Sequence, residues 1–364
     1  MKKTLLLTKE YFPFFGGVAN YCHGLFKFFK TEDYLIITDN PKVKSKNNVI
    51  NLKLENKFLK PSWFFAFFKI KKIVKENKIE QIFTPNILPL GSIAYLFNKF
   101  WQIPYVISLH GLDINLALEN KFKLTYKILK NSRQIIVNSQ ATANIVNKFP
   151  EFNNKITIIY PSLDLDFSKV EEKHLQSLKE SLKIEEKTKV FLSVGRLSVR
   201  KGHAWAIEAL YNLNLTDWKY LIVGNGPEKK NLEQLIAKYK LEKQIKILEN
   251  IDYSDLIYYY KLAKIFLLPQ RQLGNDLEGF GIVFLEAAAA RLAIIAGNNG
   301  GVLEILSDQK NALLVNNIEE IEQAIKSLLS DQDLEKLIRE NAYLRSRDFA
   351  RASEQSNKLK LILS

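Results

Sequence analysis

Two glutamates stand eight positions apart in the segment DLEGFGIVFLEAAAA, residues 276 to 290. Glu278 precedes a Gly-Phe-Gly turn, and Glu286 lies in the apolar run that follows. Ionised carboxylates only accept hydrogen bonds, so they suit the hydroxyl groups of sugars. The spacing itself decides nothing, because Glu172 and Glu180 share it in a plain charged helix. The glycines and the apolar context set the first pair apart, and eight helical steps would separate the two by about 12 Å.

The turn between these glutamates also favours an anion. If a helix begins at the second glycine, the backbone amides of Phe280, Gly281 and Ile282 lack partners within the helix. A helix N-terminus attracts negative charge through these amides and through the helix dipole. The segment therefore predicts two polyhydroxylated rings held by the carboxylates and a diphosphate held between them.

A second loop, VGRLSVRKG at 194 to 202, gathers cations between a buried strand and a helix. It contains Gly195, Arg196, Arg200 and Lys201. A fork-shaped arginine and a compact lysine near a helix start suit a diphosphate, which would relieve their mutual repulsion. A solvated loop with ordinary surface charges is the alternative reading of these residues taken alone.

The first half of the chain offers two further candidates. Gly16 and Gly17 follow the first strand and precede a helical pattern, where they could bring backbone amides close to an oxygen-rich group or serve only a turn. His110 ends a strand in SLHGLDI, so its ring can reach a bound ligand. The other histidines fall in helical patterns or after the basic turn, which leaves His110 as the strongest candidate.

The elements that must position these residues alternate along the whole chain. Apolar runs such as TLLLT, YVISL, KVFLSV and IFLLP predict buried strands, and amphipathic stretches between them predict helices. This alternation is typical of parallel sheets covered on both faces, and two such series predict two Rossmann-like, doubly wound α/β domains with an interdomain cleft. We expect domains at 1–165 and 166–348, and a C-terminal helix at 349–364 that packs back on the first domain.

Charge is distributed unevenly between the halves. Residues 1 to 165 contain 24 Lys and Arg against 11 Asp and Glu, whereas residues 166 to 364 contain 29 against 28. The basic half is therefore expected to meet an anionic partner. Segment 61–78, PSWFFAFFKIKKIVKENK, adds aromatics and five lysines that could lie on an anionic membrane surface, or form an ordinary helix on the sheet.

The sequence also indicates a compartment. Its start resembles a signal peptide, but the apolar part is only Leu5, Leu6 and Leu7, which we read as a first buried strand. No apolar run approaches the roughly 20 residues of a membrane helix, and the single Cys22 excludes an internal disulfide framework. We expect a cytoplasmic protein, peripheral on the inner face of the cytoplasmic membrane if the basic surface binds lipid.

These motifs, taken in order, resemble the retaining GT-B glycosyltransferases of glycosyltransferase family 4. The resemblance covers nearly the whole chain through Gly16-Gly17, HGLD from 110, VGRLSVRKG, VGNGPE from 223, the two glutamates and NNGGVLEIL from 298. RQLGNDLEGFGIVFLEA is similar to bacterial mannosyltransferases that act on lipid-linked acceptors. The implied activity is transfer of a hexose from GDP-mannose or a UDP-sugar to a glycan or lipid-linked acceptor in surface polysaccharide, lipopolysaccharide or glycolipid synthesis.

The resemblance also implies roles for particular positions. Arg196 and Lys201 would bind the donor diphosphate, Glu278 the transferred sugar and Glu286 the nucleotide ribose, while His110 would lie against the sugar. The glycine loop of Gly16 and Gly17 would close over donor and acceptor. The remaining donor-binding positions that it implies are Gly195, Gly224, Phe280, Gly281 and Ile282.

Other functions remain open from the residues alone. A GT-B nucleotide-sugar epimerase would need acid and base groups that the motifs lack, and a dinucleotide oxidoreductase would need G-x-G-x-x-G after the first strand. A basic binder of nucleic acid would need exposed aromatic side chains. We expect that the protein binds no nucleic acid. Asp164 and Asp166 form a D-x-D triplet, but it follows a Tyr-Pro-Ser turn, so we expect no metal and no cofactor beyond the nucleotide sugar.

Overall fold

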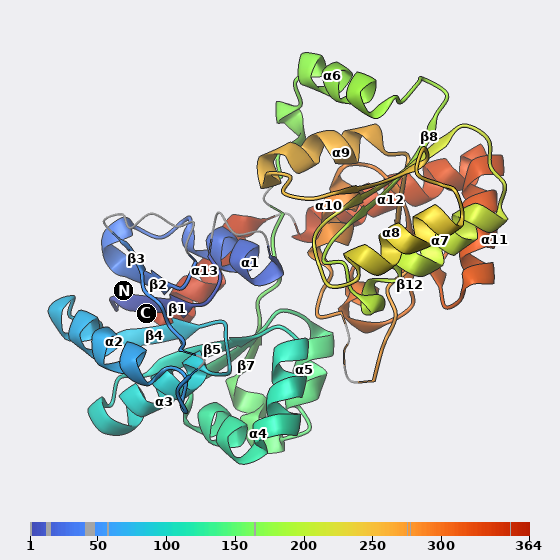
Figure 1. The fold of residues 1–364 in the computed structure, drawn as a ribbon. Helices are drawn as coiled ribbons and strands as arrows, with labels where there is room; N and C mark the ends of the chain where they lie inside the picture. The colour runs from blue at the N-terminus through green and yellow to red at the C-terminus, as the bar shows by residue number, and fades with distance from the viewer. Residues whose placement is uncertain are drawn as a thin grey trace. The chain divides into compact units, whose positions relative to one another are not determined.

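The computed structural model describes residues 2–11, 16–40, 48–56, 58–163, 165–274, 276, 278–349 and 351–364. The chain folds into two α/β units, which Figure 1 shows. Unit 1 comprises Met1–Asp164 and Arg351–Ser364, and unit 2 comprises Leu165–Ala350. The chain thus leaves unit 1 for unit 2 and later returns to it.

Unit 1 is built on a seven-stranded sheet with the order β3-β2-β1-β4-β5-β6-β7. All neighbouring strands are parallel. The strands are β1 (Thr4–Thr8), β2 (Tyr34–Thr38), β3 (Val49–Asn51), β4 (Gln81–Thr84), β5 (Tyr105–Leu109), β6 (Gln134–Val137) and β7 (Ile156–Ile158). The central strands are continuous apolar runs because helices cover both faces of the sheet.

The helices of unit 1 divide between these faces. They are α1 (Gly17–Phe26), α2 (Phe64–Glu76), α3 (Leu90–Trp101), α4 (Leu112–Asn131, kinked at Lys121), α5 (Gln140–Val146) and α13 (Ala352–Leu363). Helices α1 and α13 pack on the face that presents Leu6, Phe83 and Val106. Gly91 of α3 packs against Ile107, whose side chain points the other way from that of Val106. Helix α3 therefore covers the opposite face.

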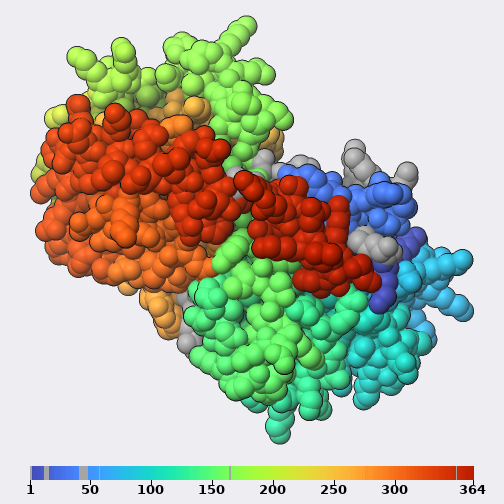
Figure 2. All heavy atoms as spheres, turned by 180° about the vertical axis from the view of Figure 1, so that it is seen from behind, coloured from blue at the N-terminus to red at the C-terminus, as the bar shows by residue number. Residues whose placement is uncertain are grey.

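Helix α13 belongs to unit 1 although it follows all of unit 2 in the sequence. Leu359 and Leu363 are fully buried in the core of unit 1. The Ser356 hydroxyl donates a hydrogen bond of 2.7 Å to the carbonyl of Leu25, and the Tyr160 amide donates one of 3.1 Å to the Gln355 side chain. Figure 2 shows α13 in dark red at the surface, beside green and blue atoms of unit 1.

Unit 2 repeats this architecture with six parallel strands in the order β10-β9-β8-β11-β12-β13. The strands are β8 (Lys189–Val194), β9 (Trp218–Val223), β10 (Ile245–Leu248), β11 (Ile265–Leu268), β12 (Ala293–Gly297) and β13 (Leu313–Val315). The helices are α6 (Glu172–Leu182), α7 (His203–Asn212), α8 (Lys229–Lys238), α9 (Leu256–Leu262), α10 (Ile282–Ala289), α11 (Ile318–Ser330) and α12 (Gln332–Phe349).

The predicted fold class, two Rossmann-like α/β domains, is confirmed in both units. The predicted strands TLLLT, YVISL, KVFLSV and IFLLP all form. Two strands, β3 and β13, were not predicted, since each has three residues and lies at a sheet edge. No helix among the described residues has the length and apolar character needed to cross a bilayer.

The strand order reverses beside β1 in unit 1 and beside β8 in unit 2. In open parallel sheets, ligands bind at the carboxyl ends of the strands where such a reversal occurs. The reversal in unit 1 lies between β1 and β4, and the reversal in unit 2 lies between β8 and β11. The loops that follow these strands therefore position the candidate residues.

Candidate functional site

The loops after β8 and β11 meet at the reversal in unit 2 and bring three charged side chains together. Lys201 Nζ lies 2.6 Å from Glu278 Oε2, and an Arg200 terminal nitrogen lies 2.8 Å from the same oxygen. All three side chains are at most 14% exposed. Arg200 also pairs with Asp276 at 3.0 Å. One buried carboxylate is thus shared between two cations, and we call Arg200, Lys201 and Glu278 the charge cluster.

The cluster fixes the ionisation of its carboxylate. Burial favours the neutral form of Glu278, but the charges of Lys201 and then Arg200, with their hydrogen bonds, outweigh burial and lower its pKa from 4.5 to about 2. A carboxylate with so low a pKa is a weak base and a weak nucleophile. Glu278 is therefore suited to accepting hydrogen bonds rather than taking protons.

The backbone next to Lys201 contains two closely packed glycines. Gly195, just after β8, has φ +151°, and a Cβ built on it would lie 3.6 Å from Lys201 Cε. A Cβ on Gly224, just after β9, would lie only 1.9 Å from the Gly195 carbonyl oxygen. Neighbouring backbones cross at this point, which only a residue without a side chain permits at Gly224.

The loop that carries Glu278 rests on a second pair of glycines, Gly300 and Gly301. The Gly301 amide donates a hydrogen bond of 2.8 Å to the Glu278 carbonyl. Gly300 has φ +67°, and a Cβ there would lie 2.6 Å from the same carbonyl oxygen. The NNGGVLEIL motif that contains both glycines therefore packs on the backbone of Glu278 and fixes its position. The sequence alone indicates no role for this motif.

Glu286 lies on α10 with 2% of its surface exposed. Tyr253 donates a hydrogen bond of 2.9 Å to one carboxylate oxygen, and Tyr260 donates one of 2.7 Å to the other. Burial and then the charge of Glu286 raise the pKa of Tyr260 well above its usual value. Tyr260 therefore keeps its proton, and the hydrogen bonds of both tyrosines orient the carboxylate.

The start of α10, where the sequence predicts an anion site, is capped by a glycine. Gly281 caps the helix with φ +82° and ψ +55° and, as a glycine, supplies no side-chain cap to the first amides. A Cβ on Gly281 would lie 2.8 Å from the Phe284 ring. Phe280 is 2% exposed and packs edge-on against Phe349, with ring centres 5.6 Å apart. The turn is thus anchored by Phe280 while the amide at Ile282 begins the helix.

The cations in the loop after β8 differ in exposure and in their partners. Arg196 is exposed, and within the described residues its side chain makes no hydrogen bond or ion pair. Arg200, which sequence reasoning named but did not select, joins the charge cluster with Lys201. His203, at the start of α7, is buried, and burial followed by the charge of Lys201 lowers its pKa to about 3. This histidine is therefore neutral at physiological pH.

His110 follows β5 in unit 1 and is partly buried. Its ring meets Tyr21 of α1 edge-on with centres 5.0 Å apart, and its Nε2 lies 3.4 Å from the Ser108 hydroxyl. Burial lowers the pKa of His110 to about 4, so the imidazole is neutral at physiological pH. Asp113 accepts a hydrogen bond of 2.8 Å from the His110 amide and so fixes the turn on which the ring stands.

The glycine loop and His110 both lie at the carboxyl ends of the strands of unit 1, and α1 brings Tyr21 to the His110 ring. Gly16 caps α1 in an extended conformation, with φ −162°, and Gly17 begins the helix. A Cβ on Gly17 would meet nothing within 4 Å. Neither glycine is therefore needed for a left-handed turn, and Gly17 is not needed for close packing. Residues 12–15, which precede them, lie outside the described residues.

Among the residues that the structure describes, no three His, Cys, Asp or Glu side chains form a group that could hold a metal ion. Asp164 of the D-x-D triplet lies outside them. Asp166 accepts hydrogen bonds from the amide and hydroxyl of Ser168 and pairs with Lys169 at 3.7 Å. Its contacts are therefore those of a local turn.

Comparison with known proteins agrees with this architecture. The family described as Glycosyltransferase Family 4 matches residues 15–167, and the family described as Glycosyl transferases group 1 matches residues 176–345. HepE of Anabaena, solved with UDP-glucose, has a TM-score of 0.84 at 17% identity, covers 99% of each chain, and shares the fold.

Two characterised relatives have defined substrates. A Campylobacter jejuni N-acetylgalactosamine-N,N'-diacetylbacillosaminyl-diphospho-undecaprenol 4-alpha-N-acetylgalactosaminyltransferase is 28% identical over 84% of this chain and 82% of its own. A Mycobacterium tuberculosis GDP-mannose-dependent alpha-(1-6)-phosphatidylinositol monomannoside mannosyltransferase is 24% identical over 73% of this chain and 70% of its own.

The two family matches follow each other along most of the chain; the first contains strands β2 to β7 and the second contains strands β8 to β13. The chain belongs to glycosyltransferase family 4, the group 1 glycosyltransferases, and has the GT-B fold. It is a glycosyltransferase that uses a nucleotide sugar as its co-substrate.

Proposed function

We propose that this chain is a retaining hexosyltransferase. It moves a hexose from GDP-mannose or a UDP-sugar to a glycan or lipid-linked acceptor, in the synthesis of a bacterial surface polysaccharide, lipopolysaccharide or glycolipid. The reaction breaks the bond between the anomeric carbon and the diphosphate oxygen and forms a new glycosidic bond to an acceptor hydroxyl. The acceptor proton leaves with the nucleoside diphosphate.

The charge cluster supports this proposal most directly. Lys201 lies next to Gly195 at the start of the loop after β8, and its ammonium group is already directed at the carboxylate of Glu278. A donor diphosphate next to Lys201, with Arg196 reaching it from the exposed part of the loop, would place the transferred sugar at Glu278. Fixed cations and the amides of Phe280, Gly281 and Ile282 would then stabilise the negative charge that develops on the leaving diphosphate.

The low pKa of Glu278 supports retention by attack on the face from which the diphosphate leaves. An inverting enzyme needs a base to activate the acceptor, and a double displacement needs a protein nucleophile. Glu278 is a poor candidate for either role because its negative charge is neutralised by Lys201 and Arg200. In the proposed mechanism it binds sugar hydroxyls, and the departing diphosphate accepts the proton of the acceptor.

The remaining roles belong to the same proposal and rest on the sequence resemblance together with the burial and hydrogen bonds of these residues. Glu286, oriented by Tyr253 and Tyr260, binds the nucleotide ribose, and Gly195 and Gly224 let the loops approach the donor. Neutral His110 offers a hydrogen bond to the sugar, and Gly16 and Gly17 supply backbone amides. The proposed location is cytoplasmic and peripheral on the inner face of the membrane, with no role for nucleic acid.

Donor binding is tested by thermal unfolding of the wild type, Glu286→Gln and Glu335→Gln with UDP, GDP, ADP and NAD. Glu335 is a buried glutamate of α12 that pairs with Arg339, so its substitution is a matched control. A ligand at 100 times its Kd stabilises the fold by about 2.7 kcal/mol. We expect UDP or GDP to stabilise the wild type and the control but to stabilise Glu286→Gln much less. Stabilisation by NAD alone, or by no nucleotide, contradicts the proposal.

The stereochemical part of the proposal needs a separate measurement. With the donor base identified, the transferred sugar is followed by NMR through the coupling of its anomeric proton. An α-linked product from an α-linked donor is expected. A β-linked product would show inversion and would remove the argument drawn from the pKa of Glu278.

A further inference from the structure

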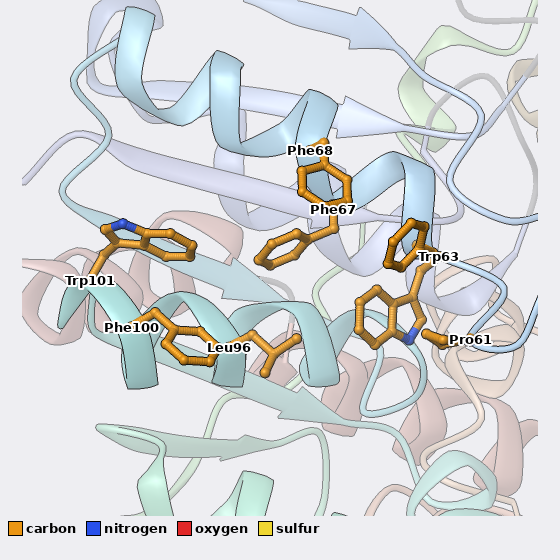
Figure 3. A pocket seen from close by; sticks show the side chains of 8 residues that line it. Pro61, Trp63, Phe67, Phe68, Leu96, Phe100 and Trp101 are labelled. Carbon is orange, nitrogen blue, oxygen red and sulfur yellow. The ribbon is translucent and has the colours of Figure 1, made fainter.

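An exposed aromatic surface lies on unit 1 between the start of α2 and the end of α3. We call it the aromatic groove. Six rings, together with Pro61 and Leu96, line a hollow of about 650 Å3. Figure 3 shows these side chains gathered on one side of the unit. The rings belong to Trp63, Phe64, Phe67, Phe68, Phe100 and Trp101.

Most of these rings are open to solvent. Phe64, Phe68, Phe100 and Trp101 are 46%, 54%, 61% and 42% exposed, and neighbouring Phe65 is 59% exposed. Single exposed apolar side chains are ordinary on protein surfaces, whereas a contiguous patch marks a surface that meets lipid or another molecule. The groove is such a patch.

The fold itself does not require the exposed rings. Helix α2 buries Ala66, Ile70 and Val74, which are spaced four residues apart and form the stripe that faces the sheet. Phe67 packs on Phe97 and Trp101 of α3, with ring centres 5.3 Å and 6.0 Å apart, and so joins the two helices. Phe64 and Phe68 lie outside this stripe, so their outward faces are available to a partner.

Positive charge surrounds the groove. Between residues 58 and 102 the chain contains seven lysines and two glutamates. Lys71 Nζ lies 4.6 Å from the centre of the Trp101 ring, and Lys99 Nζ lies 5.6 Å from the centre of the Phe100 ring. Apolar rings bordered by lysines match the boundary of an anionic bilayer, where rings enter the apolar edge and ammonium groups remain among the headgroups.

We propose that the aromatic groove is the surface by which unit 1 docks on an anionic lipid bilayer, with Phe64, Phe68, Phe100 and Trp101 inserted into the interface. A second copy of the chain fits less well, because pairing two grooves would bring two sets of lysines together. Nucleic acid also fits less well, since it stacks on open ring faces, whereas Phe64 and Phe67 pack edge-on against Phe68.

The inference rests on the proposed peripheral location and names the surface responsible for it. It does not depend on transfer, so lipid binding can be measured without an acceptor. Nucleotide binding in unit 2 reports separately on the proposed enzymatic function.

The test is co-sedimentation of the full chain with vesicles of phosphatidylcholine alone and with 30% phosphatidylglycerol, where the percentage is roughly a physiological anionic content. The variant is Phe64→Ser/Phe68→Ser/Phe100→Ser. The control is Leu361→Ser, because Leu361 is 78% exposed on α13, on the other face of the sheet. We expect wild type and control to prefer the anionic vesicles, and the triple variant to bind at least about tenfold more weakly.

Tryptophan fluorescence locates the contact. Trp63 and Trp101 belong to the groove, whereas Trp205 and Trp218 belong to unit 2. Vesicles with brominated acyl chains should quench the wild type, and a Trp63→Phe/Trp101→Phe variant should lose that quenching while it still binds. Quenching that persists in this variant would place the membrane contact elsewhere and overturn the proposal.

Three other outcomes would also overturn it: equal binding to neutral and anionic vesicles, unchanged binding by the triple variant, or a wild-type dimer that this variant abolishes. Stronger binding to a random-sequence oligonucleotide than to vesicles would do the same. Thermal shifts with UDP and GDP are measured on each variant. A triple variant that keeps its nucleotide shift but loses vesicle binding is folded, and only its docking surface has been removed.

Discussion

Replacing Glu278 by glutamine removes the negative charge between Arg200 and Lys201 while keeping the size of the side chain. In the wild type one carboxylate oxygen lies 2.8 Å and 2.6 Å from these cations, and the three side chains are at most 14% exposed. Without the carboxylate, Lys201 is left buried with no counter-charge from position 278, while Arg200 keeps Asp276. We expect a substantial loss of stability at neutral pH.

The magnitude follows from the pKa of Glu278, which falls from 4.5 to about 2 on folding. Each tenfold change in acidity corresponds to about 1.4 kcal/mol, so the ionised carboxylate stabilises the folded chain by about 3 kcal/mol at pH 7. Because the pKa is lower in the folded state, this stability is present above pH 4.5 and is lost as the pH falls towards 2. About half of it should remain at pH 3.

The assay is urea unfolding of wild type and Glu278→Gln at pH 7, 5 and 3, and the quantity of interest is their difference in unfolding free energy. Glu340→Gln is the matched control, because Glu340 pairs with Arg291 at the same 2.6 Å but is 41% exposed. Exposed pairs contribute about 1 kcal/mol or less. A cost for Glu278→Gln no larger than that of the control, or a difference that does not shrink from pH 5 to pH 3, would refute the reasoning.

Two further substitutions test the supports of the site. Tyr260→Phe removes the 2.7 Å hydrogen bond to Glu286 and should cost about 2 kcal/mol. It should also weaken nucleotide binding, which calorimetry measures. An unchanged affinity would show that the carboxylate of Glu286 does not need this hydrogen bond to orient it. Gly224→Ala places a Cβ 1.9 Å from the Gly195 carbonyl oxygen and should cost about 3 kcal/mol or more in thermal unfolding. Gly17→Ala meets open space and should cost less than about 0.5 kcal/mol, so equal losses would contradict the crowding argument.

The central part of the fold could be predicted from the sequence because both sheets are parallel and covered on both faces. Such strands are continuous apolar runs, as in TLLLT and KVFLSV, and each is bounded by polar turns. The edge strands Val49–Asn51 and Leu313–Val315 were missed, since three residues are too few to show a period. Their place depends on pairing with β2 and β12, which is not a local property.

The site was predicted less completely than the fold. The glutamates and the cationic loop could be found because their positions after strands are readable from the sequence. The pairing of Arg200 with Glu278 could not be read, because Arg196 and Arg200 are both charged residues of one loop and their directions depend on how that loop folds into the 3₁₀ turn Val199–Lys201. Likewise, Tyr253 and Tyr260 reach Glu286 through tertiary packing, across 33 and 26 residues.

The position of α13 has a consequence for biosynthesis. Unit 2 is one continuous segment of the chain, whereas unit 1 needs Leu359 and Leu363, which the ribosome adds only after all of unit 2. Unit 1 is therefore the first unit to be synthesised and the last to be completed. Until α13 arrives, the face of the first sheet that presents Leu6, Phe83 and Val106 lacks part of its cover. The nascent chain thus carries exposed apolar surface throughout the synthesis of unit 2, and chaperones can bind it during that time. A product truncated before α13 would keep this surface exposed and would aggregate.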